Sequence, residues 1–240
     1  MKGKLVMVDG LDGSGKGVVV DAIAEWCAES GKRILDLRKY CIEKNTFPQP
    51  GELGNYDIII SSEPSFCYIG KAIREELVRA DGRRYSAMSL ANAFALDREI
   101  LYKRVLLPAL QLGINVFQER GVVSSLVYQP VQERIQLSEL LRMPGNKLAI
   151  DNAPSLLLIT TVSPETVVKR LGARDKKDNS IFDTLSFQRK IDERYRSDWL
   201  RHLFENSGSK VVYLDTDEPK TVEETKTAAL EIVKKFLENH

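Results

Sequence analysis

The chain is poor in cysteine and has no long apolar run, and each shortage excludes a class of protein. Its 240 residues include three cysteines, Cys27, Cys41 and Cys67, an odd number without the spacing of metal ligands. We therefore expect reduced packing residues and no disulfide framework. No apolar run approaches the length of a membrane span, and no signal-peptide core is present. These absences favour a cytoplasmic protein without a membrane partner.

An excess of charge of one sign is also absent. Thirty-five basic and thirty-four acidic residues give a net charge of +1, so no overall field attracts nucleic acid, and none is expected as a partner. A small anion held by a local cluster is compatible with this balance. A hydrophobic fraction of 43% is typical of a globular protein with a sizeable core, and no repeat or low-complexity linker divides the chain. We predict a single domain over residues 1–240.

Short apolar runs alternate along the chain with longer helical patterns. The strand-like runs are 4–8, 33–37, 57–60, 114–118, 156–161 and 210–214, and the helical patterns are 18–30, 69–79, 86–104 and 221–238. Such alternation favours an α/β fold with three layers, α/β/α, around a parallel sheet of about five strands. Residues 44–55 are rich in proline, glycine and polar residues, which predicts an exposed loop.

A glycine-rich stretch, residues 8–17 (VDGLDGSGKG), joins the first apolar run to the first helical pattern. In this context glycines let successive backbone N–H groups converge on one anion, while the helix N-terminus and Lys16 add positive charge. The stretch is therefore predicted to be a nucleotide-phosphate loop. Its expected ligand-binding residues are Gly10, Leu11, Asp12, Gly13, Ser14, Gly15, Lys16, Gly17 and Val18. Gly17 departs from the usual pattern, which places there a Ser or Thr whose hydroxyl binds Mg²⁺.

Further polar residues follow the apolar runs, where open parallel sheets collect functional groups. Glu119 and Arg120 come directly after one run; the carboxylate could hold a metal ion or accept a proton, and the guanidinium could clamp a phosphate. Taken alone, such a pair is more often a surface ion pair. Phe94 and Arg98 share a helix face, although a core Phe and a solvated Arg are the simpler interpretation. The basic run 169–177 fits either a solvated helix end or a mobile lid.

The order and spacing of these motifs resemble the thymidylate kinases over nearly the whole chain. The phosphate loop, the Glu63-Pro64 motif, the segment 94–98 and the segment 119–129 each have a counterpart at the spacing of that family. The resemblance implies a P-loop nucleoside-monophosphate-kinase fold with a lid near 170–184. It implies transfer of the γ-phosphoryl group of ATP to a pyrimidine deoxynucleotide, dTMP first among them, with Mg²⁺ present. It also implies a homodimer.

The resemblance further assigns roles to individual residues. The residues expected to be catalytic are Lys16, Glu119, Arg120 and Arg174. Those expected to bind the acceptor are Asp12, Glu63, Pro64, Arg74, Phe94, Arg98, Arg120, Ser124, Ser125, Tyr128 and Gln129. Glu119 would hold Mg²⁺, directly or through water, and Arg170 would lie beside ATP. Arg174 in the lid would supply positive charge to the transferring phosphoryl group.

The chain departs from the family at several positions. Gly17 lacks the metal-binding hydroxyl, Glu119 replaces an Asp, and Ser62 stands where many members have a phosphate-binding Arg. Ser65-Phe66 replaces two glycines, and residues 38–56 have the character of an insertion. Two alternatives therefore stay open. One is a deoxynucleoside kinase with Glu119 as its base, and the other is a non-catalytic nucleotide-binding relative.

Overall fold

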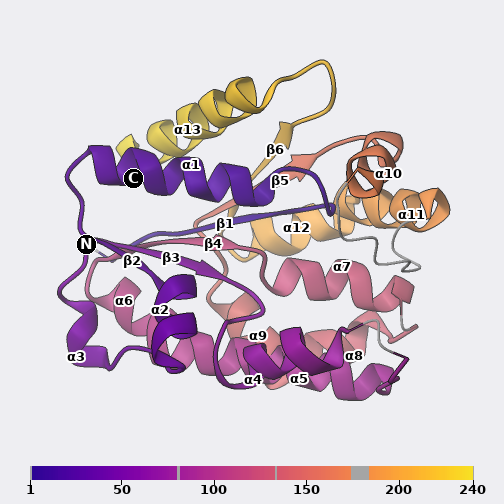
Figure 1. Cartoon of the computed structure of the whole chain (residues 1–240), viewed down its shortest axis with the longest axis horizontal. Coiled ribbons are helices and arrows are strands. Elements are labelled where there is room, and N and C mark those ends of the chain that lie inside the picture. Colours follow the sequence, from indigo (N-terminus) through magenta and orange to yellow (C-terminus); the bar gives the residue numbers. More distant parts are fainter. Residues whose placement is uncertain (1, 80–81, 133, 174–183, 240) are drawn as a thin grey trace.

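A six-stranded parallel sheet forms the centre of the computed structural model, which describes residues 2–79, 82–132, 134–173 and 184–239 (Figure 1). The strands are β1 (Leu5–Gly10), β2 (Ile34–Asp36), β3 (Ile58–Ser62), β4 (Asn115–Glu119), β5 (Leu156–Thr161) and β6 (Lys210–Asp215). Their spatial order is β2-β3-β4-β1-β5-β6, and all neighbours are parallel. The predicted α/β class is confirmed. The sheet has six strands where about five were expected, because the short β2 pairs with β3 along the edge.

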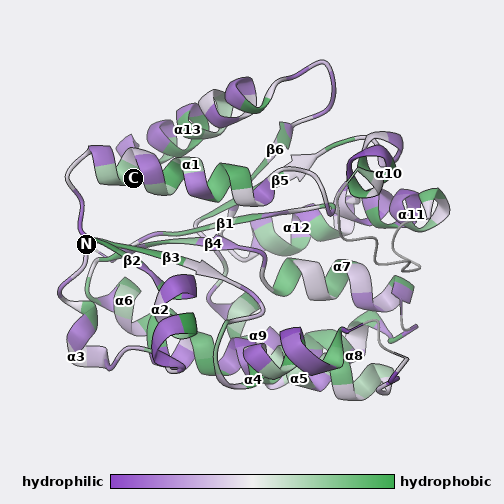
Figure 2. Cartoon of the chain, in the orientation of Figure 1, coloured by the Kyte–Doolittle hydropathy of each residue, from purple (hydrophilic) through white to green (hydrophobic). Residues whose placement is uncertain are grey.

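Helices cover both faces of the sheet and bury its strands between two cores, which Figure 2 shows as hydrophobic strands inside more polar helices. Successive residues of β1 alternate between the cores: Leu5 and Met7 lie in one, Val6 and Val8 in the other. The helices α1 (Lys16–Glu29) and α13 (Val222–Glu238) pack against Val6 and Val8 (Figure 1). The helices that pack into the other core include α5 (Ala87–Leu101), α6 (Leu107–Gln111), α7 (Val122–Gln132), α8 (Leu137–Arg142), α9 (Pro144–Asp151), α10 (Pro164–Gly172), α11 (Leu185–Tyr195) and α12 (Asp198–Asn206).

Two long helical segments contain a turn of π-helix. α5 continues into the π-helix η2 (Tyr102–Leu106) and then into α6, so the helix predicted over 86–104 extends through Pro108. Pro108 lies directly after the π-helical turn, in the first turn of α6. The helix predicted over 69–79 likewise consists of α4 (Tyr68–Ala72) and the π-helix η1 (Ile73–Leu77). No helix among the described residues is long and apolar enough to cross a membrane.

Most residues of 44–55 are exposed, as predicted, but the segment is not a simple loop. The segment between β2 and β3 forms two short helices, α2 (Leu37–Lys44) and α3 (Pro50–Leu53), and it buries Phe47 and Leu53 in the core. Its proline, glycine and polar residues serve as turns and caps around these two apolar anchors. The three cysteines are free and buried, as predicted, with Cys41 of α2 packed 3.1 Å, Sγ to Sγ, from Cys67.

The helix α9 was not predicted, and it packs unusually closely on α5. A Cβ atom added to Gly145 would lie 1.8 Å from the carbonyl oxygen of Ala95, so only glycine allows the two backbones to approach this far. Pro144 occupies the first turn of α9 and favours the extended conformation seen at Met143, which defines where the helix starts. Pro144 and Gly145 therefore determine where α9 starts and how closely it packs on α5.

We expect Gly145→Ala to lower the free energy of unfolding by about 3 kcal/mol, because the added methyl group must push two packed helices apart. Urea denaturation followed by circular dichroism measures the change. Gly51→Ala is the matched control, since Gly51 is also helical but has nothing within 4 Å of its added Cβ. Equal stability of the two variants would contradict the close-packing argument.

Candidate active site

The glycine-rich loop between β1 and α1 lies at the carboxyl edge of the sheet. Gly13 and Gly15 have φ of 77° and 86°, in the left-handed region that favours glycine. Ser14 anchors the loop to β5, because its hydroxyl lies 2.6 Å from the hydroxyl of Thr160. Gly15 caps α1 without a side-chain hydrogen bond, so the first N–H groups of the helix are left for another acceptor. These features give the loop the backbone arrangement of an anion site.

The Lys16 side chain is buried at this loop and folds back over it. Its ammonium donates to the carbonyl oxygens of Gly10 and Leu11, at 3.0 and 2.5 Å. Burial, together with the positive charge of Arg120, lowers the pKa of Lys16 to about 8, against the opposing effect of the Asp12 carboxylate 3.9 Å away. Carbonyl oxygens bind an ammonium more weakly than a charged phosphate does, so an incoming phosphate can replace them.

Asp9, at the carboxyl end of β1, joins three elements of the site. Its carboxylate accepts hydrogen bonds from the backbone N–H of Gly10 at 2.8 Å, from the N–H and hydroxyl of Ser124, and from the hydroxyl of Tyr195 at 2.8 Å. Sequence reasoning missed this residue. The available signal was an acidic residue at the end of an otherwise apolar strand, where a fully buried charge needs several donors.

Arg120 lies where β4 leads into α7 and faces the phosphate loop. Its φ of 62° is left-handed, and its backbone N–H donates to the carbonyl oxygen of Val8 on β1. The guanidinium forms an ion pair with Asp12 of the loop and donates to the Ser124 hydroxyl at 3.3 Å. The structure thus brings together three predicted site residues from distant parts of the sequence.

Glu119, the last residue of β4, presents its carboxylate to the start of α1. A Cβ atom added to Gly17 would lie 3.7 and 3.8 Å from the two carboxylate oxygens, which is ordinary contact. Among the described residues, no hydrogen bond or salt bridge engages these oxygens. A hydroxyl side chain at position 17 would therefore lie beside the Glu119 carboxylate. The lone pairs of this carboxylate remain available to a ligand.

Glu63 and Arg98 form a buried ion pair behind the phosphate loop. The Nε and Nη2 atoms of Arg98 lie 2.8 and 2.7 Å from a Glu63 carboxylate oxygen, and both side chains are almost fully buried. Gln118 donates to the other Glu63 oxygen at 3.0 Å, while Ser125 and Asn146 accept from the guanidinium. Burial raises the pKa of the Glu63 carboxyl to about 7, although the Arg98 charge opposes the shift.

Arg74, in η1, covers the turn that follows Glu63. Its guanidinium donates to the carbonyl oxygens of Pro64 and Ser65 and stacks 3.9 Å from the ring centre of Phe66. Among the described residues it forms no salt bridge, and burial lowers its pKa. The turn itself is held by Asp97, which accepts from the N–H and hydroxyl of Ser65 at 2.7 and 2.6 Å.

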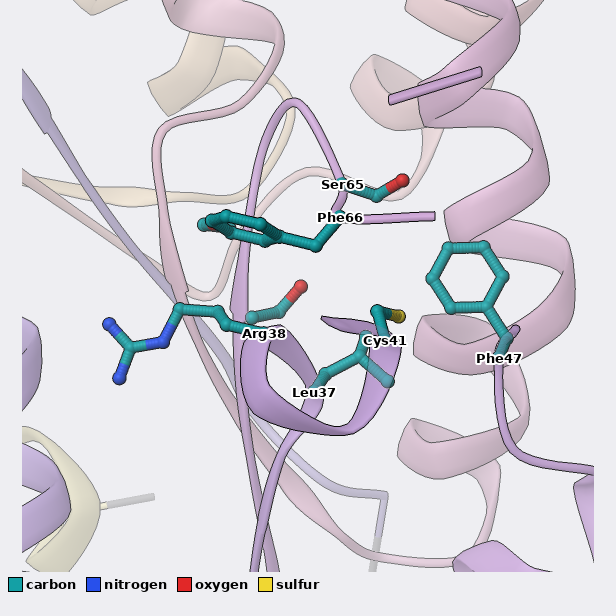
Figure 3. A pocket seen from close by; sticks show the side chains of 8 residues that line it. Leu37, Arg38, Cys41, Phe47, Ser65 and Phe66 are labelled. Carbon is teal, nitrogen blue, oxygen red and sulfur yellow. The ribbon is translucent and has the colours of Figure 1, made fainter. Parts of the chain in front are cut away.

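The helix α2, which belongs to the apparent insertion, closes a pocket under this turn. Figure 3 shows Ser65 and Phe66 above it and Leu37 and Cys41 below, with the Arg38 side chain extending away. Arg38 is held outside by Asp36 and Asp21, at 2.9 and 3.0 Å. The segment between β2 and β3 therefore packs under the turn of residues 63–66. Because Arg38 is paired with two carboxylates, it does not replace the arginine that many family members have at the position of Ser62.

Three of the residues predicted to bind the acceptor, Phe94, Tyr128 and Gln129, lie on α5 and α7. Phe94 is half-buried one turn before Arg98, and Gln129 is buried with its side-chain oxygen lacking a partner among the described residues. Tyr128 instead supports the phosphate loop, since its hydroxyl accepts from the Asp12 N–H at 3.2 Å. An amide oxygen without a partner can accept a hydrogen bond from a ligand N–H.

The basic run 169–177 begins in the last turn of α10 and reaches the phosphate loop through Arg170. Arg170 donates to the carbonyl oxygen of Gly13 at 3.0 Å and to that of Thr216 at 2.8 Å. Its contact with ATP stays a prediction. The predicted lid arginine, Arg174, lies outside the described residues, as does most of the predicted lid.

Comparisons with known proteins agree on one family. The chain matches the family model described as thymidylate kinase over residues 52–229. A thymidylate kinase of Caldicellulosiruptor saccharolyticus is 31% identical over 195 residues, which are 80% of each chain. This chain belongs to the thymidylate kinase family. A second family member, from Ligilactobacillus salivarius, is 27% identical over 230 residues, covering 94% of this chain and 96% of that protein.

A solved structure shows the same fold. The thymidylate kinase of Ehrlichia chaffeensis aligns with a TM-score of 0.64 over 98% of each chain, at 17% sequence identity. At this identity the comparison supports the fold and not the individual side chains.

The residues present are compatible with a Mg²⁺ ion. The described residues contain no cluster of three or more acidic, His or Cys side chains that could hold a metal alone. Mg²⁺ does not need one, because it commonly keeps several waters and binds one or two carboxylates plus substrate phosphates. Glu119 is the carboxylate beside the phosphate loop with free lone pairs, whereas the Asp9 oxygens already accept four hydrogen bonds.

We expect ATP binding to take up roughly half a proton at pH 8, because bound phosphates favour the charged form of Lys16, whose pKa in the free protein is about 8. The affinity for ATP should then fall as the pH rises above 8. Isothermal titration calorimetry in two buffers of different ionisation enthalpy measures the uptake. Adenosine, which has no phosphates, is the control and should bind without it. Zero uptake with ATP would contradict the assignment of Lys16.

Proposed function

We propose that this thymidylate kinase family member transfers the γ-phosphoryl group of ATP to dTMP. The observation that carries the proposal is Arg74, a half-buried guanidinium without a salt bridge among the described residues. Its hydrogen bonds go to neutral carbonyl oxygens, so an anionic ligand would supply the counter-charge that it lacks. A second cation site, the Lys16 loop, lies at the same edge of the sheet. Two phosphate sites at one edge suit transfer from one nucleotide to another.

The donor side is formed by the phosphate loop. The N-terminal N–H groups of α1 and the ammonium of Lys16 would hold the β- and γ-phosphates, and Arg170 would stay against Gly13 as the loop closes on them. Arg120, already paired with Asp12, would turn toward the transferring group. Phosphoryl transfer depends mainly on such positioning and charge neutralisation, because little covalent chemistry is required of the protein.

The acceptor side is formed by residues of η1, α5 and α7. Arg74 and Arg98 would contact the acceptor phosphate, and Phe94 would offer a stacking face for the base. The unpartnered oxygen of Gln129 can accept a hydrogen bond from the ring N–H of a pyrimidine such as thymine. The resemblance to the family supports Arg174 as the lid cation, a homodimer and a cytoplasmic location.

We expect dTMP to be phosphorylated in preference to dUMP, dCMP, purine monophosphates and free thymidine. A methyl group in an apolar pocket contributes about 1–3 kcal/mol of discrimination, so dUMP should be a poor but detectable substrate. Measuring ATP consumption over this panel with Mg²⁺ present gives kcat/KM for each acceptor. Faster turnover of thymidine than of dTMP would replace this proposal with a deoxynucleoside kinase, and no turnover of any acceptor would favour a non-catalytic relative.

We also propose that Glu119 provides most of the protein's contribution to Mg²⁺ binding, in place of the hydroxyl that Gly17 lacks. When bound, Mg²⁺ neutralises charge on the β- and γ-phosphates. The support is the free Glu119 carboxylate beside Gly17. Glu119→Gln should raise the Mg²⁺ concentration for half-maximal activity by on the order of tenfold and lower kcat. A Mg²⁺ titration of the steady-state rate measures both.

Gly17→Thr in the Glu119→Gln background tests the compensation directly. The added hydroxyl should lower the Mg²⁺ requirement again, and room exists for the new Cβ atom at 3.7 Å from the nearest Glu119 oxygen. Gly17→Ala, which adds the carbon without the hydroxyl, is the matched control and should not rescue. Additive effects of the two substitutions would show that the positions do not compensate for each other.

A further inference from the structure

The proposed function relies on Arg74, and an aromatic ring covers one face of its guanidinium. The central carbon of that group, Cζ, lies 3.9 Å from the ring centre of Phe66. An arginine at this distance from an aromatic face is in cation–π contact, which strengthens as the pair is removed from water. Both side chains are half-buried, so the contact is partly shielded from solvent. Phe66 therefore interacts with the charge of Arg74 and not only with its aliphatic stem.

Hydrogen bonds hold one edge of the same guanidinium. Nε donates to the carbonyl oxygens of Pro64 and Ser65, at 3.0 and 3.1 Å, and Nη2 lies 3.5 Å from the Ser62 hydroxyl oxygen. These contacts fix the edge of the group, but carbonyl oxygens accept over a broad range of angles. They therefore leave the plane of the group free to tilt about that edge. The ring of Phe66 blocks this tilt because it lies on the face.

The edge contacts also place Arg74 at the carboxyl end of the sheet. Ser62 is the last residue of β3, and its register partner is Glu119, which ends β4 beside the phosphate loop at Gly17. Burial lowers the pKa of Arg74, and the charges of Glu119 and Arg120 are among those that act on it as well. The Nη1 atom has no hydrogen bond among the described residues. Two of the five N–H groups therefore remain for a ligand.

We infer that Phe66 is a positioning residue for the acceptor site: its ring fixes the plane of the Arg74 guanidinium, so that the free N–H groups meet the acceptor phosphate in one orientation. The inference rests on the proposed function, in which Arg74 contacts that phosphate. Arginine is long and flexible, and ordering it on binding costs free energy that a preformed contact avoids. The ring occupies only a face of the group and leaves its N–H edges open. Phe66 thus restrains the cation without competing with the anion.

The ring of Phe66 is itself held by the structure around it. Figure 3 shows it above Leu37 and Cys41 of α2, which line a pocket together with it. The preceding residue, Ser65, donates its N–H and its hydroxyl to the carboxylate of Asp97, at 2.7 and 2.6 Å. The backbone before the ring and the floor below it are therefore both fixed. Through this ring, α2 is connected to the proposed acceptor site.

The test compares the Kd values of dTMP, thymidine and ATP for variants of Phe66, measured by isothermal titration calorimetry. Phe66→Leu keeps an apolar side chain but removes the aromatic face. We expect its Kd for dTMP to rise about fivefold, because Arg74 must then be ordered when the phosphate binds. Thymidine has no phosphate and ATP would bind at the Lys16 loop, so their Kd values should change less than about twofold.

Two further variants serve as controls. Phe66→Tyr keeps the ring face, and its Kd for dTMP should stay within about twofold of the wild type. Trp26→Leu is the matched control, because Trp26 also forms a cation–π contact, with Lys234 at 5.2 Å, but packs against the core on the opposite face of the sheet. It should leave all three Kd values unchanged. In an Arg74→Gln background, Phe66→Leu should add no further rise, because the ring then has no cation to hold.

Three results would overturn the inference: an unchanged Kd for dTMP in Phe66→Leu, an equal rise for dTMP and thymidine, or an equal effect of Phe66→Leu in the Arg74→Gln background. So would a wild type that binds dTMP no more tightly than thymidine. If Phe66→Leu does not fold, as judged by thermal melting, Phe66→Met takes its place, because it too lacks an aromatic face. Failure of the proposed function is recognised separately, as absent turnover of dTMP by the wild type, whereas these Kd values require no turnover.

Discussion

The buried ion pair between Glu63 and Arg98 is the interaction on which the rest of the proposed acceptor side depends. Two charges removed from water are stable only when each is paired and the remaining donors and acceptors are satisfied. Glu63 extends from the end of β3, Arg98 from α5, and their further partners come from β4, α7 and α9. Satisfying this one pair therefore requires that five elements meet at one point.

Asp9 likewise holds several elements together, at the phosphate loop that forms the proposed donor side. Its carboxylate takes four hydrogen bonds and so ties the end of β1 to α7 and to α11, which leads back from the predicted lid. The strand β4, which ends in Glu119 and leads to Arg120, lies between β3 and β1 in the sheet. The Asp9 and Glu63 carboxylates each accept several hydrogen bonds, while the side-chain oxygen of Gln129 has no hydrogen-bond partner and Arg74 has no salt bridge among the described residues. That contrast separates the supporting groups from those available to a ligand.

The departures from the family pattern become intelligible in this setting. Glu119, longer by one methylene than the usual Asp, lies against the glycine that replaces the usual hydroxyl residue. Ser65, in place of a glycine, holds the acceptor turn through Asp97, and Phe66 covers Arg74. The segment between β2 and β3 supports the same turn through α2. These substitutions form a connected set around the site, which fits retained chemistry better than decay.

The sequence by itself determined the strands, the phosphate loop and the family. Each of these depends on local pattern: a period-two or continuous apolar run, glycines before a helix, and motif spacing. It also indicated that polar residues such as Glu119 and Arg120 would gather near the phosphate loop, because parallel strands bring their carboxyl ends to one edge. Only the tertiary structure decided which polar residues are saturated and which are free. Asp9 and Asn146 escaped notice for this reason, since each resembles an ordinary polar residue until its distant partners are known. The short helices of the segment 37–53 were hidden by turn-rich composition, and burial of Phe47 and Leu53 is a long-range packing effect that no local pattern encodes.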